Sequence, residues 1–295
     1  MGLINRIDLI IYALVTTPVI GVILLAECGV VPVLSPIGFR CRDPKLSYKY
    51  NGDTISARLL LLITFVSPFL VVVGAECWCN RYKSGVCRDC SWWKAAVIWY
   101  RDFLLGFLVV IAVTVVIKGI VGEPRPHFLD TCQPKEAKNC TNQFISKFEC
   151  GNKNVSSYYI QDASKSFPSG HAAFSFYLFV FLAWFLQRRL EDVKPIVIIT
   201  LQTIVLTWAI GCSLSRLTDH RHHWWDVLAG SFIGSFIAIC SIKSLSIGLK
   251  SNEMDSASDN TTASLERKST DSFEISSQEL CSNTSIKWLI PNTNN

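Results

Sequence analysis

The sequence is poor in charge. Only 17% of its 295 residues are Asp, Glu, Lys or Arg, whereas soluble domains usually carry about 25%. Half of the residues are hydrophobic, and they gather in runs of about 20 residues, the length that a helix needs to cross a bilayer. The shortage of charge therefore excludes an ordinary soluble domain and predicts a membrane protein with several spans.

Other absences remove further classes of function. No basic stripe is interleaved with aromatic residues in a soluble segment, so the net charge of +5 does not indicate a nucleic-acid partner. No small-x-small cleavage site closes the first apolar run, which predicts an uncleaved helix and not a secretory signal. Gly2 lacks the Ser or Thr at position 6 that N-myristoylation requires. No internal repeat is visible.

Six apolar runs predict an all-α polytopic membrane protein with six transmembrane helices. The runs are Asp8–Ala26, Arg58–Ala75, Phe103–Val121, Ala172–Gln187, Pro195–Ser213 and Trp225–Ser244. Residues 1–7 would form a cytosolic N-terminus and residues 8–245 one membrane domain. Residues 246–295 are rich in Ser, Thr, Asn and acidic residues, which predicts a disordered cytosolic tail.

The distribution of Lys and Arg sets the expected orientation, because these residues favour cytosolic loops. They gather at Arg6, in residues 81–101, in residues 188–194 and in the tail, all on one side of six spans. The first outer loop is also basic, which weakens the trend without reversing it. In this orientation two glycosylation patterns, at Asn139 and Asn154, lie outside.

Nine of the twelve cysteines lie in segments expected on one side of the membrane or the other. Those expected outside, where disulfides persist, are Cys28, Cys41, Cys132, Cys140 and Cys150. Their connectivity cannot be deduced from spacing. Those expected inside are Cys77, Cys79, Cys87 and Cys90, for which a zinc site, palmitoylation and plain reduced thiols all stay open.

Two clusters of polar residues stand at the ends of predicted spans. Lys118 closes the third span and is followed by Arg125-Pro126; alone, it reads as a lysine that extends its ammonium to the interface. The segment Pro168–His171 opens the fourth span. There Ser169 suits a helix N-cap and Gly170 permits close approach of a ligand to the backbone. A helix N-terminus attracts anions, although simple capping would explain the same residues.

A third cluster, Ser215–Asp226, joins the fifth and sixth spans and holds three of the five histidines. If the chain is already helical from His222, then His222 and Asp226 lie one turn apart on the same face. A carboxylate there would fix the imidazole tautomer and leave the other ring nitrogen free to attack. His223 is the competing nucleophile. A metal site built from the histidines is disfavoured, because no acidic cluster accompanies them.

The predicted topology brings all three clusters to one face of the membrane. The third and fifth spans end there, and the fourth and sixth begin there. Histidines, a carboxylate, cations and a helix N-terminus would then converge. This combination suits an oxyanion with an ester bond, because cations and N–H groups bind phosphate oxygens while one histidine attacks and another protonates the leaving group.

The three motifs resemble those of the type 2 phosphatidic acid phosphatase (PAP2) superfamily, in order and spacing. They are Lys118 with Arg125-Pro126, Pro168-Ser169-Gly170-His171, and Ser215-Arg216 with His222 and Asp226. The segments Arg125–Leu129, Ser166–His171, His222–Trp224 and Gly38–Ile55 look like the animal lipid phosphate phosphatases. The resemblance covers roughly residues 5–245. Glu123-Pro124 and Trp225 depart locally, at positions that the pattern leaves free.

The resemblance implies a helical core shared with haloperoxidases and a role for each motif residue. His222 would be the nucleophile and Asp226 would orient it, while His171 would serve as general acid and then base. Lys118, Arg125, Ser169, Gly170 and Arg216 would hold the phosphate. No cofactor and no Mg²⁺ would be needed. The substrates would be phosphatidate, lysophosphatidate, sphingosine 1-phosphate or ceramide 1-phosphate.

The expected location is the plasma membrane with the active site outside the cell, or an internal membrane with the site in the lumen. A homo-oligomer stays an open alternative. Alternatives include a phosphatase specific for sphingoid phosphates, a lipid phosphotransferase and a catalytically silent scaffold. A scaffold relative would lack the lysine or the histidines, which this chain keeps. A transporter would carry charges at midplane within broken helices, whereas here they lie at span ends.

Overall fold

The computed structural model describes residues 37–83, 92–138 and 140–244, together with Thr17 and Gly21. The elements are β1 (Phe39–Arg40), a 3₁₀ turn η1 (Pro44–Leu46), α2 (Ala57–Lys83), α3 (Trp92–Val121), α4 (Phe128–Cys132), a 3₁₀ turn η2 (Lys135–Lys138), β2 (Phe144–Ile145), α5 (Ser157–Asp162), α6 (Gly170–Arg189), α7 (Pro195–Thr218) and a last helix, Trp224–Ser244. The structure is thus mostly helical, with very little strand.

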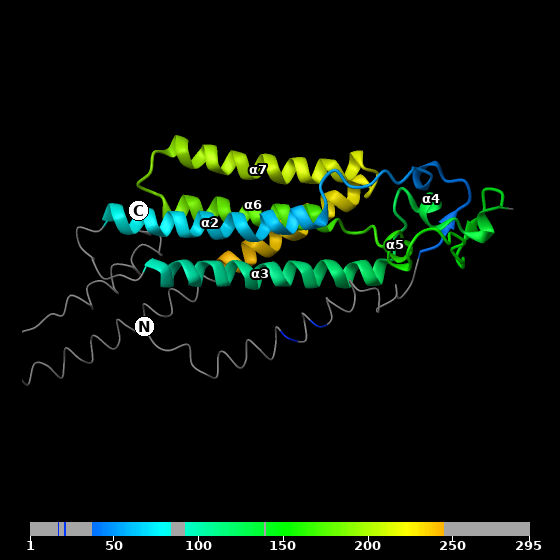
Figure 1. Ribbon diagram of the computed structural model, residues 1–295, viewed down its shortest axis with the longest axis horizontal. Coiled ribbons are helices and arrows are strands. Elements are labelled where there is room, and N and C mark those ends of the chain that lie inside the picture. Colours follow the sequence, from blue (N-terminus) through cyan, green and yellow to red (C-terminus); the bar gives the residue numbers. More distant parts are fainter. Residues whose placement is uncertain (1–16, 18–20, 22–36, 84–91, 139, 245–295) are drawn as a thin grey trace, which may run out of the picture.

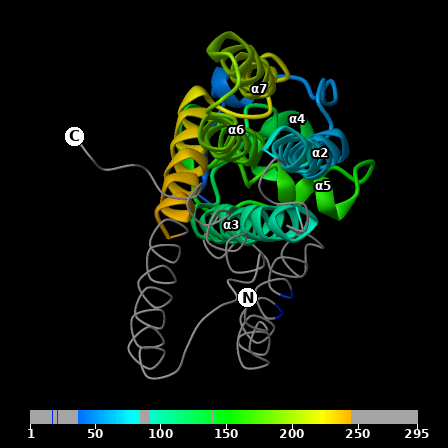
Figure 2. The same cartoon turned by 90° about the vertical axis from the view of Figure 1, so that its left-hand side faces the viewer.

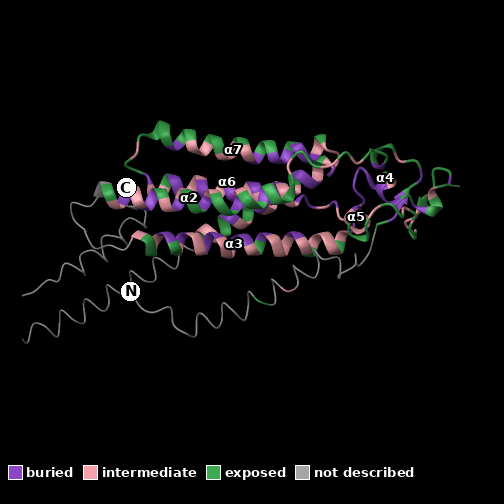
Figure 3. Cartoon of the chain, viewed as in Figure 1, coloured by how far each residue is buried: buried purple, intermediate pink, exposed green. Residues whose placement is uncertain are grey.

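The long helices form a bundle around α6. Helix α6 packs against α2, α3 and α7, and the end-on view shows it surrounded by them and by the last helix (Figure 2). Its buried side chains are large and apolar, including Phe181 and Phe185. The outward faces of α2 and α7 are apolar and exposed (Figure 3). Exposed apolar faces around a packed centre are what a membrane helix bundle requires.

Five helices of the described residues are long and apolar enough to cross a membrane: Ala57–Arg81, Trp92–Val121, Gly170–Arg189, Pro195–Thr218 and Trp224–Ser244. They coincide with the second to sixth predicted spans. The first predicted span, Asp8–Ala26, the N-terminus 1–7 and the tail 246–295 lie outside the described residues, so a count of six is not confirmed.

Two boundaries were wrong by a wide margin. The second span was expected to end at Ala75, but α2 continues to Lys83. The third span was expected to begin at Phe103, but α3 begins at Trp92. The predicted span begins only after Arg101, because charged residues mark the edge of the bilayer. Charge does not end a helix, however, and residues 92–102 contain no Gly or Pro to break one. The helix therefore continues beyond the apolar run.

The last helix approaches α6 closely through two glycines. A Cβ atom at Gly230 would collide with the carbonyl oxygen of Ser169, and one at Gly234 with that of Ala173. Gly230 and Gly234 are four residues apart, the small-xxx-small spacing that lets membrane helices pack closely. This contact holds the start of the last helix against the start of α6, where two of the three polar clusters lie.

Replacing Gly234 by alanine is expected to lower the free energy of unfolding by about 1–3 kcal/mol, because backbone must shift to admit the methyl group. Thermal unfolding in detergent micelles measures the change. Gly211→Ala in α7 is the matched control, since its Cβ would meet open space, and alanine favours a helix over glycine by about 1 kcal/mol. Equal stability of the two variants would contradict this packing role.

A small layer covers the bundle at the end where α4 and α5 lie (Figure 1). Strand β1 pairs antiparallel with β2, Phe39 opposite Ile145. Two disulfides, Cys41–Cys140 and Cys132–Cys150, tie the same segments together. Phe39 and Phe128 form a separate buried cluster beneath them. The sheet is an addition to the expected all-α fold, and it fixes the outer loops that border the polar clusters.

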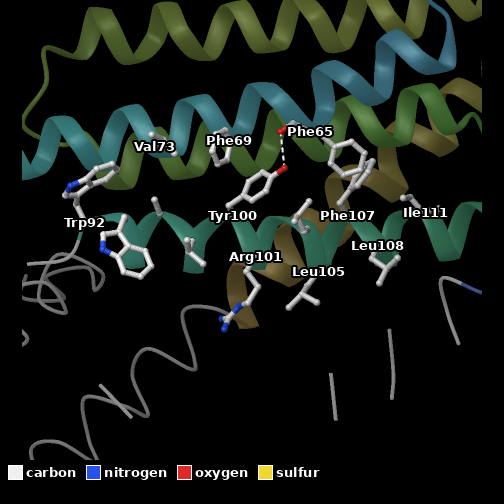
Figure 4. A pocket seen from close by; sticks show the side chains of 14 residues that line it. Phe65, Phe69, Val73, Trp92, Tyr100, Arg101, Leu105, Phe107, Leu108 and Ile111 are labelled. Atoms are coloured by element: carbon white, nitrogen blue, oxygen red, sulfur yellow. Dashed lines mark hydrogen bonds between the residues drawn. The ribbon is translucent and has the colours of Figure 1, made fainter. Parts of the chain in front are cut away.

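An apolar groove of about 810 Å³ lies between α2 and α3. Phe65 and Phe69 of α2 and Leu105 of α3 line it, and Tyr100 Oη donates to the carbonyl oxygen of Phe65 at 3.2 Å (Figure 4). None of the predicted site residues lines this groove. Its lining offers little for polar chemistry, so the candidate site must be sought at the end of the bundle.

Candidate active site

The three polar clusters meet at one end of the bundle. Helices α3 and α7 end there, and α6 and the last helix begin there (Figure 1). Three contacts join the clusters or the residues next to them. Lys118 Nζ donates to the carbonyl oxygen of Lys165 at 2.9 Å, Ser169 N donates to the carbonyl oxygen of Asp226 at 3.0 Å, and Arg125 Nη1 lies 3.3 Å from His222 Nε2.

The contact between His222 and Asp226 exists, but not for the predicted reason. The last helix begins at Trp224, so His222 precedes it and is not helical. Asp226 lies in the first turn, where its Oδ2 accepts from the backbone N–H of His223 at 2.9 Å. This is the carboxylate half of a capping box. Capping, and not helix periodicity, leaves Oδ2 3.5 Å from His222 Nδ1.

The neighbours of His222 determine which ring nitrogen carries the proton. Arg125 Nη1 can only donate, so His222 Nε2 must accept and is unprotonated. The proton then lies on Nδ1, which faces Asp226 at a distance longer than an ordinary hydrogen bond. Burial lowers the pKa of His222 well below its usual value, and the charges of Arg125 and Lys118 lower it further. The imidazole is therefore neutral, with a lone pair on Nε2.

Arg125 is 4% exposed and is held by Asp162. Its Nη2 donates to Asp162 Oδ1 at 2.7 Å, and its Nε donates to the Asp162 carbonyl oxygen at 2.7 Å. Arg221 binds the other carboxylate oxygen. Burial raises the pKa of Asp162, but Arg125, Arg221 and Lys118 outweigh it and bring the pKa to about 2. Asp162 is thus an ionised clamp that aims Arg125 at His222.

Arg216 is 1% exposed and fully engaged. Its guanidinium donates to Asp53 Oδ1, to Asp219 Oδ2 and to the carbonyl oxygen of Ile55, each at 3.0 Å. The same carbonyl lies 3.1 Å from His171 Nε2. Arg216 and His171 therefore share one acceptor on the segment before α2, which places them side by side at the edge of the site.

The start of α6 matches its prediction. Ser169 is the N-cap, and its side chain accepts from Ala172 N at 3.4 Å. Gly170 is the first helical residue and His171 follows it. The carbonyl oxygen of Ile55 can only accept a hydrogen bond, so Nε2 of His171 carries a proton. A protonated ring nitrogen and a helix N-terminus thus lie together at this end of the bundle.

The other histidines have separate partners. His223 Nε2 lies 3.2 Å from the Pro124 carbonyl oxygen, and its ring stacks on Trp225. His220 stacks on Tyr48. His127 lies between Thr131 and Arg221, and burial and the neighbouring arginines lower its pKa to about 3. Within the described residues, no group of three or more His, Cys, Asp or Glu side chains is arranged to hold a metal ion.

Sequence reasoning missed the acids that hold the arginines. Asp53 and Asp219 lie in segments that the sequence analysis singled out but were given no role there, and Asp162 lies in none of the motifs. In the sequence, only their opposite charge connects these acids with Arg125 and Arg216. Charge alone does not predict which acid pairs with which arginine. Ser166 was also missed; its Oγ donates to Asp226 Oδ2 at 2.6 Å.

Two predicted features remain partly outside the described residues. Asn154 is exposed, as a glycosylated asparagine must be, while Asn139 is not described. Cys77 and Cys79 lie near the end of α2, and the thiol of Cys79 contacts the carbonyl oxygen of Arg189. Cys87 and Cys90 are not described, so the zinc and palmitoylation interpretations stay predictions.

Comparisons with known proteins agree with the motifs. "Phospholipid phosphatase homolog 1.2 homolog" of Caenorhabditis elegans is 34% identical over 69% of this chain and 64% of its own length. A Drosophila melanogaster protein, provisionally named a phosphatidate phosphatase, is 30% identical over 68% of this chain and 59% of its own. "Phospholipid phosphatase 1" of Rattus norvegicus is 32% identical over 68% of this chain and 72% of its own length.

The chain thus spans less than two thirds of the length of the first two of these relatives. No solved structure gives a significant match. The family model described as "PAP2 superfamily" matches residues 99–246, half of the chain, and this range contains all three motifs. The chain belongs to the PAP2 superfamily.

Proposed function

We propose that the protein is an integral-membrane lipid phosphate phosphatase that works through a phosphohistidine and needs no Mg²⁺. The single observation that carries the proposal is the environment of His222. Its Nε2 lone pair faces Arg125, and Asp226 lies behind its Nδ1. A neutral imidazole whose unprotonated nitrogen lies beside a fixed guanidinium places a nucleophile next to a cation that can bind the phosphate.

The proposed reaction has two steps. In the first, His222 Nε2 attacks phosphorus, a P–N bond forms, and the ester P–O bond breaks. His171 takes a proton from the phosphomonoester as it binds and gives that proton to the leaving alkoxide. In the second, His171 takes a proton from water, the oxygen of that water bonds to phosphorus, and the P–N bond breaks. Phosphate is released and His222 is regenerated.

The remaining site residues hold the phosphate in this proposal. Lys118, Arg125 and Arg216 supply positive charge, and Ser169 and Gly170 stand at the N-terminus of α6, whose free N–H groups favour anions. Asp162 keeps Arg125 in place. The guanidinium of Arg216 already donates hydrogen bonds to protein acceptors. Its contribution to phosphate binding is therefore chiefly its positive charge beside His171. Asp226 stabilises the cationic imidazole as the P–N bond forms.

The substrates proposed are phosphatidate, lysophosphatidate, sphingosine 1-phosphate and ceramide 1-phosphate. A site at the end of the spanning helices lets a head group enter while the acyl chain stays in lipid. The active site is proposed to face the outside of the cell or a lumen. The two described disulfides support this side, since both lie at the end of the bundle that holds the site, and disulfides persist in oxidising compartments.

Phosphate release from phosphatidate in detergent micelles with excess EDTA tests the proposal. Wild-type protein is expected to release phosphate undiminished by EDTA, since no step uses a metal. Activity lost with EDTA and restored by a divalent ion would refute the metal-independent mechanism. No release from any of the four lipid phosphates would refute the phosphatase assignment itself and favour a non-catalytic scaffold.

A further inference from the structure

Glu123 has no role in the motifs, yet its side chain lies next to the site. It follows α3 and precedes Arg125 by two residues. Its Oε1 accepts from Trp225 Nε1 at 2.9 Å, and its carbonyl oxygen accepts from Ser166 N at 2.9 Å. Glu123 and Trp225 are the two local departures from the family pattern noted above, and in the structure they bind each other.

Asp226 has one oxygen that the described hydrogen bonds leave unused. Its Oδ2 accepts from Ser166 Oγ at 2.6 Å and from His223 N at 2.9 Å. Its Oδ1 is buried and, among the described residues, has no hydrogen-bond partner. Asp226 itself is 0% exposed, and a buried carboxylate oxygen without a donor costs free energy.

We propose that Glu123, in its protonated form, is a positioning residue that donates a hydrogen bond to Asp226 Oδ1 and thereby holds Asp226 against His222. When Glu123 ionises, the donor is lost and two carboxylates face each other, so Asp226 no longer orients the nucleophile. The proposal rests on the proposed phosphatase function and adds to it a pH-dependent control of the nucleophile.

The energetics of the carboxyl pair support the geometry. Burial, followed by the negative charge of Asp226, raises the pKa of Glu123 to about 7, and a hydrogen bond with Asp226 contributes. The bond from Trp225 acts in the opposite direction, because it stabilises the ionised form. Glu123 is therefore protonated below about pH 7 and ionised above it, and activity is expected to fall as pH rises through this value.

Other charged and titratable groups surround the pair. From the last helix and its cap come His222 and His223, the latter stacked on Trp225. From α3 comes Lys118, which bonds to the backbone of Lys165 beside Ser166. From η1 comes Lys45, whose Nζ lies 6.0 Å from the centre of the Trp225 ring.

The test compares rates of phosphate release at about pH 6 and about pH 8 within each variant. A loss of activity that is equal at both pH values is therefore no evidence for the proposal. For wild type the rate at the higher pH is expected to be about tenfold lower, because one unit above the pKa leaves about a tenth of Glu123 protonated. Glu123→Gln keeps an N–H donor toward Asp226 and cannot ionise. Its rates at the two pH values are expected to be equal within about twofold.

Two further variants sharpen the experiment. Trp225→Phe removes the bond that favours ionised Glu123, so the fall in rate is expected to move to higher pH. Glu149→Gln is the matched control, since Glu149 is an exposed glutamate paired with Lys135, and its profile should equal that of wild type. Glu123→Ala, which has no donor, is expected to be slow at both pH values.

The outcomes separate this proposal from the function on which it depends. If wild type releases no phosphate at any pH, the phosphatase assignment fails. If wild type is active and Glu123→Gln keeps the wild-type fall between the two pH values, the role of Glu123 is refuted while the phosphatase stands. A Glu123→Gln enzyme that is slowed equally at both pH values, with the fall retained, would show a merely structural role.

Discussion

Replacement of His222 by alanine is expected to lower phosphate release at least about 10⁴-fold, because no other group can form the covalent intermediate. His222 is the histidine whose lone pair faces a fixed cation and whose other nitrogen faces a buried carboxylate. Incubation with ³²P-labelled lysophosphatidate and rapid quenching should give a labelled wild-type protein. The label should survive alkali and be lost in acid, because the phosphohistidine bond is stable in alkali and labile in acid. The His222→Ala protein should carry no label.

His223→Gln is the matched control for this experiment. His223 lies next to His222 in the chain, but its ring stacks on Trp225 and its Nε2 contacts a backbone carbonyl oxygen. Glutamine can replace that contact, and the backbone N–H that binds Asp226 is retained. A loss below about tenfold is expected, which is small beside the loss of a nucleophile. If His223→Gln were inactive and His222→Ala active, the nucleophile would be His223 and the geometry above would be misassigned.

Replacement of His171 by alanine is expected to lower the steady-state rate by about 10²–10⁴-fold, the usual contribution of a general acid or base. The loss should depend on the leaving group. Phenolate needs a proton more than 4-nitrophenolate does, so the first step with 4-nitrophenyl phosphate should be much less impaired than with phenyl phosphate. Stopped-flow measurement of the burst of phenol or nitrophenol isolates this step.

The second step should remain slow in His171→Ala with either substrate, because activation of water also needs His171. The phosphoenzyme should therefore accumulate with 4-nitrophenyl phosphate. His220→Asn serves as control, since His220 stacks on Tyr48 and has a φ of 50°, which asparagine tolerates. An equal loss with both leaving groups would show that His171 does not protonate the leaving alkoxide.

Much of the site could be predicted because its residues lie in short motifs at span ends. The composition predicted membrane helices, and the described helices follow the second to sixth runs. Ser169 was predicted as an N-cap from local chemistry alone and is one. Convergence of Lys118, His171 and His222 followed from the alternation of spans, because an odd number of crossings between two clusters would have separated them.

Other features could not be predicted, because they depend on contacts between distant segments. The start of α3 at Trp92 was missed because charge marks a bilayer edge and not a helix end. The pairing of Asp162 with Arg125 joins residues 37 positions apart, and that of Asp53 with Arg216 joins residues 163 apart. Nothing in local sequence chooses among several acids and several arginines.

Composition and local spacing were enough to predict the membrane helices, the three motifs and their common end of the bundle, because hydrophobic length and spacing are properties of the chain alone. Contacts between distant segments were needed to show that His222 precedes its helix, that Asp226 caps that helix while facing the imidazole, and that Glu123 accepts a hydrogen bond from Trp225, the neighbour of Asp226. These depend on how the last helix packs on α6 at Gly230 and Gly234. Burial then fixes protonation, since the environment that shifts a pKa exists only once the helices have packed.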